Sequence, residues 1–121
     1  MIYCANIYCF RGIFENLQNL DEEHFNKDIW AFAYKEDDRA TNLICKPVKS
    51  KIIQDGNYSA HFYEYKSNGK DLKKNGINLY ARFFTDTYEE AVKGFNMLVN
   101  KRIDSLQEEI VKLDSMLIKD K

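Results

Sequence analysis

Residues 87–118, TYEEAVKGFNMLVNKRIDSLQEEIVKLDSMLI, decide the fold of this chain. The stretch contains no proline, and its single glycine is Gly94. Thr87 and Glu90 have the spacing of a capping box, which marks a helix start. Apolar side chains then recur in steps of three or four residues, a near-heptad spacing that predicts one helical stripe. The stripe comprises Val92, Phe95, Val99, Ile103, Leu106, Ile110, Leu113 and Leu117.

The predicted helix is too long for a domain of this size to cover. At about 1.5 Å per residue, residues 87–118 extend over roughly 45–50 Å. A domain of 121 residues has a radius of gyration of only about 14 Å. We therefore expect residues 106–117 to pack against another copy, giving a homodimer or a higher homo-oligomer. The alternative is a helix broken near Asn100 into a hairpin that covers its own apolar face.

Length and composition predict one domain over residues 1–121 in the cytoplasm. Aromatic residues make up 14% of the chain, enough for a real core. The three cysteines, Cys4, Cys9 and Cys45, form no C-x-x-C pair and cannot all be paired, as expected in a reducing compartment. The sequence has neither a signal-peptide pattern nor an apolar run of membrane-spanning length, so we expect no membrane partner.

Charge is distributed unevenly along the chain. Residues 1–38 carry three basic and eight acidic side chains, a net charge of −5. Residues 39–84 carry nine basic and three acidic side chains, a net charge of +6, and residues 85–121 carry six and eight, a net charge of −2. The middle third is therefore a candidate anion-binding surface.

The residues before the helix have the patterns of β-strands. We predict strands over 2–10, 29–35, 58–65 and 77–84, with a short helix or an ordered loop over 13–28. Residues 42–53 contain two strand-like runs around Pro47, which places this proline at a sheet edge, a bulge or a connection. Turns are expected at residues 36–39 and 55–57. Strands followed by a long helix indicate an α+β fold, here an antiparallel sheet of about five strands followed by one long C-terminal helix.

Catalytic patterns are weak, so we expect no enzyme, no metal site and no cofactor. His24 and His61 have no partner at a metal-ligand or nucleophile spacing. Cys4 and Cys9 are an odd number of residues apart, which puts them on opposite faces of a flat strand. Runs of carboxylates, as at residues 21–23, are typical of solvated loops.

Aromatic and basic residues alternate instead on the predicted hairpins. Rings stack on bases and cations hold phosphates, so this mixture suits nucleotides or single-stranded nucleic acid. An amphipathic sheet with a lysine-rich solvent face would give the same composition. The residues concerned are Tyr58, Phe62, Tyr63, Tyr65, Tyr80, Phe83 and Phe84, among Lys46, Lys49, Lys51, Lys66, Lys73, Lys74 and Arg82.

We place a candidate pocket where the last predicted strand meets the helix. Alternation along the strand puts Tyr80, Arg82 and Phe84 on one face, and Asn96 and Asn100 share a face of the following helix. Rings would then hold a base, the arginine a phosphate, and the asparagines ribose hydroxyls or base edges. In the alternative arrangement, Phe84 is buried in the core and Arg82 lies in solvent.

Residues 79–91, LYARFFTDTYEEA, followed by Phe95-Asn96 and Lys101-Arg102-Ile103, resemble the Thoeris anti-defence sponge proteins of phages. The resemblance covers roughly residues 77–105. It implies a β-sheet followed by C-terminal helices, assembly through dimers, and sequestration of cyclic ADP-ribose-type signals made by TIR enzymes; some members also bind cyclic oligonucleotides.

The pockets of that family combine stacking aromatics, an asparagine and arginines near subunit interfaces. The resemblance therefore implies an aromatic role for Phe83 or Phe84, a polar role for Asn96, and a location in the host cytoplasm. This chain has no arginine after Arg102, whereas those pockets are rich in arginine. The candidate ligand-binding residues are Tyr80, Arg82, Phe83, Phe84, Asn96, Asn100 and Arg102.

The leading hypothesis is a non-catalytic protein that sequesters a small nucleotide signal. A second is a mobile-element inhibitor that acts by protein–protein contact, like an anti-CRISPR protein, through its acidic N-terminal third and the exposed helix. A third, a single-strand nucleic-acid module, is disfavoured because the chain as a whole is not basic.

Overall fold

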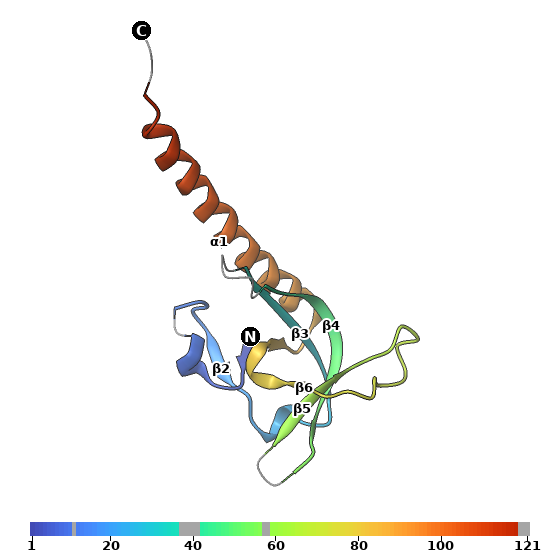
Figure 1. The fold of residues 1–121 in the computed structure, drawn as a ribbon. Coiled ribbons are helices and arrows are strands. Elements are labelled where there is room, and N and C mark those ends of the chain that lie inside the picture. Colours follow the sequence, from blue (N-terminus) through green and yellow to red (C-terminus); the bar gives the residue numbers. More distant parts are fainter. Residues whose placement is uncertain (11, 37–41, 57–58, 119–121) are drawn as a thin grey trace.

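A computed structural model of the chain describes residues 1–10, 12–36, 42–56 and 59–118. All of the strands precede the long helix α1 (Figure 1). The elements in chain order are β1 (Ile2–Cys4), η1 (Ile7–Phe10), β2 (Leu17–Asn19), η2 (Glu22–His24), β3 (Asp28–Lys35), β4 (Leu43–Gln54), β5 (Ala60–Glu64), β6 (Ile77–Asn78), η3 (Leu79–Ala81), β7 (Phe83–Thr85) and α1 (Tyr88–Ser115), where η denotes a 3₁₀ helix.

The predicted α+β class is confirmed, but the sheet is mixed and larger than predicted. It has seven strands in the order β2-β1-β7-β3-β4-β5-β6. β1 and β2 pair in parallel and the other neighbours are antiparallel. The parallel pair arises in residues 13–28, where a helix or a loop was expected. After η1 the chain returns to the starting end of β1, so β2 runs alongside it in the same direction.

Two predicted long strands are broken by asparagine side chains. Residues 2–10 form β1 and then η1, because Asn6 Oδ1 accepts a hydrogen bond from the Tyr8 amide at 3.0 Å. Residues 77–84 divide into β6, η3 and β7, because Asn78 Oδ1 accepts from the Tyr80 amide at 2.8 Å. Such local side-chain acceptors offer the backbone a tight turn in place of a strand ladder.

Pro47 lies within β4, a 12-residue strand in the middle of the sheet. The β3–β4 register shifts there, since Ala31 pairs with Val48 whereas Ala33 pairs with Cys45. Of the three placements considered for this proline, the structure therefore selects the bulge, where a missing amide hydrogen is tolerated. Most of the turn predicted at 36–39, and Asn57 of the turn at 55–57, lie outside the described residues.

The sheet buries side chains on both faces. α1 packs on the face of Phe32, Phe83 and Cys4, and Phe14 also joins this cluster. Trp30, Phe32 and Tyr34 alternate along β3 and share this face. The opposite face is closed by the curled strands β5 and β6 and by η3, around Tyr3, Ile29, Ala31, Ile52, Phe62, Leu79 and Phe84.

α1 is one continuous helix, which excludes the break near Asn100. Thr87 is its N-cap and accepts from the Glu90 amide at 3.2 Å, as the capping-box spacing predicted. Only its N-terminal half contacts the sheet, through buried Ala91, Gly94 and Leu98. The C-terminal half extends away from the sheet (Figure 1).

Candidate functional site

The structure does not assemble the pocket expected from the sequence. Phe84 has 0% exposure and packs edge-on against Phe62, with ring centroids 5.3 Å apart. It faces away from α1, because alternation along β7 turns Phe83 rather than Phe84 toward the helix. Asn96 and Asn100 are exposed on α1 and do not approach that strand face. The expected grouping of Phe84 with the asparagines is therefore wrong.

Arg82 is half-buried on the Phe84 face, rather than in solvent as the alternative arrangement had it. Its guanidinium carbon lies 5.8 Å from the centroid of the Phe62 ring, a cation–π distance. Burial raises the pKa of the nearby Cys45 thiol, and Arg82 partly offsets this. Arg82 thus lies beside the Phe62 ring and the Cys45 thiol of the sheet.

Two of the predicted residues, Tyr80 and Phe83, meet in a different cavity, which we call the aromatic cleft. Its volume is about 700 Å³. It opens between η1, the ends of β3 and β4, η3 and α1. It is lined by Cys9, Phe10, Ile13, Ala33, Tyr34, Lys35, Asn42, Leu43, Tyr80, Phe83 and Leu98.

Four aromatic rings line the aromatic cleft, those of Phe10, Tyr34, Tyr80 and Phe83. Phe10 packs on Phe83 with centroids 4.8 Å apart, so the floor is fixed by core packing. Tyr34 is held edge-on by Phe95 of α1 at 6.0 Å. Tyr80, in contrast, is 60% exposed, so one face of its ring is open to a ligand.

Polar groups at the edge of the aromatic cleft gather around the Tyr34 hydroxyl. Its hydroxyl donates to Glu36 Oε2 at 2.7 Å, and this bond raises the pKa of Tyr34. Arg102 of α1 approaches the same carboxylate, with Nε 3.6 Å from Oε2. Arg102, another predicted site residue, is therefore placed beside the cleft through Glu36, although it does not line it.

The aromatic cleft can stack and orient a planar molecule. Its walls are rings and aliphatic side chains, and its polar groups are two phenols, one lysine, one amide and one thiol. Pockets of about 300–1,000 Å³ with a few polar groups among apolar walls are the usual size for small-molecule ligands. Among the described residues, no three His, Cys, Asp or Glu side chains are grouped as a metal site would need.

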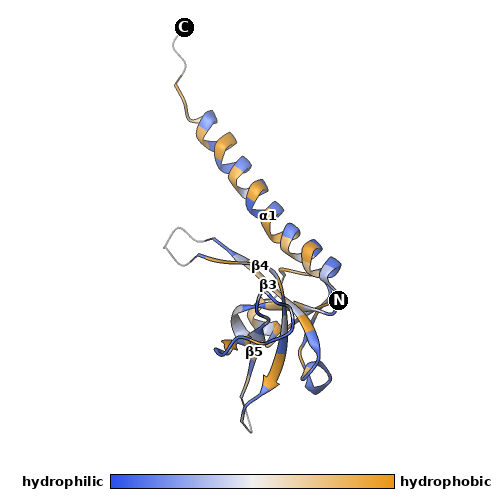
Figure 2. Ribbon diagram, turned by 90° about the vertical axis from the view of Figure 1, so that its right-hand side faces the viewer, coloured by the Kyte–Doolittle hydropathy of each residue, from blue (hydrophilic) through white to orange (hydrophobic). Residues whose placement is uncertain are grey.

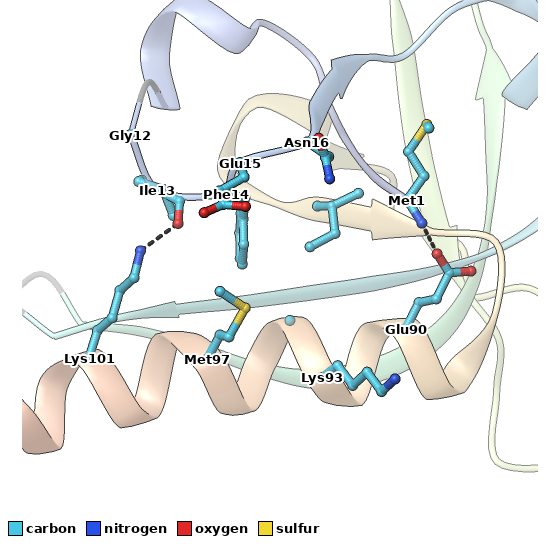
Figure 3. A pocket seen from close by; sticks show the side chains of 12 residues that line it. Met1, Gly12, Ile13, Phe14, Glu15, Asn16, Glu90, Lys93, Met97 and Lys101 are labelled. Atoms are coloured by element: carbon cyan, nitrogen blue, oxygen red, sulfur yellow. Dashed lines mark hydrogen bonds and ion pairs between the residues drawn. The ribbon is translucent and has the colours of Figure 1, made fainter.

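A second concavity, the N-terminal groove, lies between residues 12–16 and α1 (Figure 3). Its volume is about 560 Å³, and none of the seven predicted residues lines it. Two of its cations already bond within the protein. The N-terminal amine pairs with Glu90, and Lys101 Nζ donates to the carbonyl of Ile13 (Figure 3). We therefore take the aromatic cleft as the stronger ligand site.

Sequence reasoning missed Phe10, Tyr34, Asn42 and Cys9 as lining residues. Phe10 and Cys9 were assigned to a continuous strand, so the 3₁₀ turn that carries them to the cleft was not anticipated. The signal was Asn6, whose side chain starts that turn. Asn42 was placed at the start of the strand-like run over residues 42–53, whereas it directly precedes β4, and nothing in that pattern pointed to a ligand site.

Comparison of the chain with protein-family models, with curated proteins and with solved structures gives no match. Within the described residues, α1 and the shorter helices are not long and apolar enough to cross a membrane.

Proposed function

We propose that this protein binds a small, planar, nucleotide-type signal in the aromatic cleft and sequesters it without changing it chemically. The observation that carries the proposal is the exposed ring of Tyr80 in a cleft that Tyr34 and the packed pair Phe10 and Phe83 also line. Base–aromatic stacking contributes about 1–3 kcal/mol per base. A rigid floor with one exposed ring suits capture of a flat heterocycle.

The ligand class we propose is a cyclic ADP-ribose-type or cyclic nucleotide immune signal, and the biological role is counteraction of host anti-phage defence. This class rests on the resemblance of residues 77–105 to phage sponge proteins. Lys35 and Asn42 line the cleft beside the rings. An ammonium group and an amide are suited to a phosphate and to ribose hydroxyls.

The test is calorimetric titration with cyclic ADP-ribose isomers and cyclic dinucleotides. Tyr80→Ala should weaken binding by roughly fivefold to a hundredfold, as expected for the loss of one stacking contact. Tyr8→Ala is the matched control, because Tyr8 is similarly exposed, at 68%, and does not line the cleft. Equal affinities for both variants would place the site elsewhere.

Sequestration also makes a chemical prediction. Ligand released by denaturing the complex should have the same mass and retention time as the ligand added. Recovery of a cleaved or modified product would contradict sequestration and make the protein an enzyme.

A second candidate function is inhibition of a host protein by direct contact, as in an anti-CRISPR-like inhibitor. The exposed apolar side chains on the projecting half of α1 favour it. Substitutions in the cleft and on the helix distinguish the two functions. Tyr80→Ala should reduce defence evasion if the cleft acts, whereas only substitutions on the helix should do so if protein contact acts.

A further inference from the structure

The projecting half of α1 carries a row of apolar side chains that the described residues leave uncovered. We call this row the seam; it comprises Ile103, Leu106, Ile110, Leu113 and Leu117. Ile103 and Leu106 are 43% and 38% exposed, and exposure is higher farther along, at 64% for Ile110 and 66% for Leu117. Apolar and polar residues alternate along this half of the helix (Figure 2). Leu117 follows the helix in a further turn, with its amide bonded to the Asp114 carbonyl.

The spacing of the seam is that of a coiled coil. Its steps of three, four, three and four residues place it in the alternating core positions of a heptad repeat, with isoleucine at Ile103 and Ile110 and leucine at Leu106 and Leu113. A second copy of this chain supplies the same row, so the seam is self-complementary.

Charge decides the direction in which two copies pair. In a parallel pair in register, Glu109 lies beside the core at the position that faces Asp114 of the second copy. Two such like-charge contacts would form, one on each side of the dimer. Like charges at these flanking positions oppose pairing.

An antiparallel pair removes this conflict in one register. With Ile110 facing Leu113 of the second copy, Leu106 faces Leu117. Glu109 then flanks Met116, and Gln107 flanks Asp114. If the pairing is shifted by one heptad toward the sheet, Glu109 of one chain instead flanks Glu109 of the other, which restores a like-charge contact.

We propose that two copies of this chain pair through their seams as an antiparallel coiled coil, with Leu106 opposite Leu117 and Ile110 opposite Leu113. The overlap of residues 106–117 extends about 16 Å at about 1.5 Å per residue. The two sheets lie at opposite ends of the paired helices, so neither sheet obstructs the other. This inference is independent of the ligand proposed for the aromatic cleft.

The first test is the oligomeric state of the full chain by sedimentation velocity. The unaltered protein should be a dimer, and Ile110→Asp should be a monomer at the same concentration. Val111→Asp is the matched control, because Val111 is 69% exposed and lies off the seam on the same helical turn. Circular dichroism of both variants shows whether the sheet domain still folds.

The second test fixes the direction of pairing. Leu106→Cys and Leu117→Cys chains are prepared separately, one with an affinity tag, then oxidised alone and as a mixture. The antiparallel dimer should cross-link only in the mixture, because like positions are about 16 Å apart and unlike positions are adjacent. The unaltered chain, which retains Cys4, Cys9 and Cys45, controls for cross-links between native thiols.

The two tests distinguish antiparallel pairing, parallel pairing and the absence of pairing through the seam. Cross-linking of each variant with itself, with no cross-link between the tagged and the untagged chain in the mixture, would show a parallel pair and overturn the proposed direction. A monomeric unaltered protein would overturn pairing through the seam altogether, as would a dimer that Ile110→Asp leaves intact.

Discussion

At the scale of single residues, the contact between Gly94 and Phe32 fixes how closely the helix approaches the sheet. A Cβ atom at Gly94 would lie 2.5 Å from Phe32 Cζ. That ring has 0% exposure and is held by Phe14 and Phe83, so it has little room to move. Glycine at this helical position therefore reflects packing and not backbone flexibility.

We predict that Gly94→Ala destabilises the fold, although alanine is ordinarily favoured over glycine within a helix by about 0.5–1 kcal/mol. Overpacking a core position costs about 1–3 kcal/mol, which exceeds that gain. Chemical denaturation measures the change. Ser105→Ala on the exposed part of α1 is the control and should be close to neutral. Phe32→Leu combined with Gly94→Ala should cost less than the two single changes together, because leucine lacks the clashing ring atoms.

Phe84 gives a second prediction at this scale. Since its ring is fully buried against Phe62, Phe84→Ala should destabilise the protein by about 3–5 kcal/mol. Thermal unfolding checks the loss of stability. Unchanged stability combined with lost ligand binding would return Phe84 to the role in a binding site that the sequence suggested.

The Asp28 carboxylate gives a prediction for acid conditions. The hydrogen bond from the Tyr65 hydroxyl lowers the pKa of Asp28. The positive charges of Lys49 and Lys51 lower it further. A group with a lowered pKa in the folded state stabilises the fold above its unfolded pKa of about 3.9, and this contribution is lost as the pH falls through the folded pKa. Tyr65→Phe should therefore raise the pKa of Asp28. It should also reduce the part of the stability loss at low pH that comes from protonating Asp28.

Carbon-detected NMR titration of Asp28 measures this shift directly. Tyr63→Phe is the control, because the Tyr63 hydroxyl bonds to Asp55 and not to Asp28. An unchanged Asp28 pKa in Tyr65→Phe would show that the lysines, and not the phenol, hold it down.

At the scale of elements, the sequence predicted long regular segments well and short interruptions poorly. The helix start at Thr87 and the strand over residues 29–35 follow from capping chemistry and alternation, which are local. The breaks at Asn6 and Asn78 are also local, but each depends on one side-chain hydrogen bond competing with a strand ladder. Strongly apolar neighbours concealed that competition, so both segments were predicted as unbroken strands.

The helix shows a related limit of pattern analysis. The apolar row read from the sequence runs through Val92 and Val99, whereas the row buried on the sheet is Ala91, Gly94 and Leu98. Small residues count little in a hydrophobic pattern, yet they permit close approach. The apolar row therefore leaves the sheet on one side of α1 and continues into the exposed seam.

This division of α1 makes a dynamic prediction. A helical segment without tertiary contacts is marginally stable in water, because nucleation and backbone ordering are offset mainly by packing. Amide hydrogens of residues 106–113 should therefore exchange faster than those of residues 91–98 in dilute protein. If seams pair, their protection should increase with protein concentration. Exchange that is independent of concentration across the dimerisation range would contradict pairing through this segment.

At the scale of the whole molecule, the candidate site combines residues that no local pattern connects. Tyr80 and Phe83 were anticipated as ligand-binding residues, and the structure brings them together in the aromatic cleft. Their neighbours come from η1 and from the ends of β3 and β4, far away in sequence. Sheet order decides such meetings, and it depends on the mixed topology that the sequence did not reveal.

The positions of the cleft and the seam predict that binding and pairing are separable. The aromatic cleft lies against the sheet end of α1, and Leu98, the residue that α1 supplies, precedes the seam. Titration with cyclic ADP-ribose should therefore give one ligand per chain, with the same affinity in the unaltered protein and in Ile110→Asp. Tyr80→Ala should in turn lose affinity and keep the oligomeric state of the unaltered protein. A stoichiometry of one ligand per two chains, or loss of binding in Ile110→Asp with the sheet domain still folded, would place the ligand between the copies.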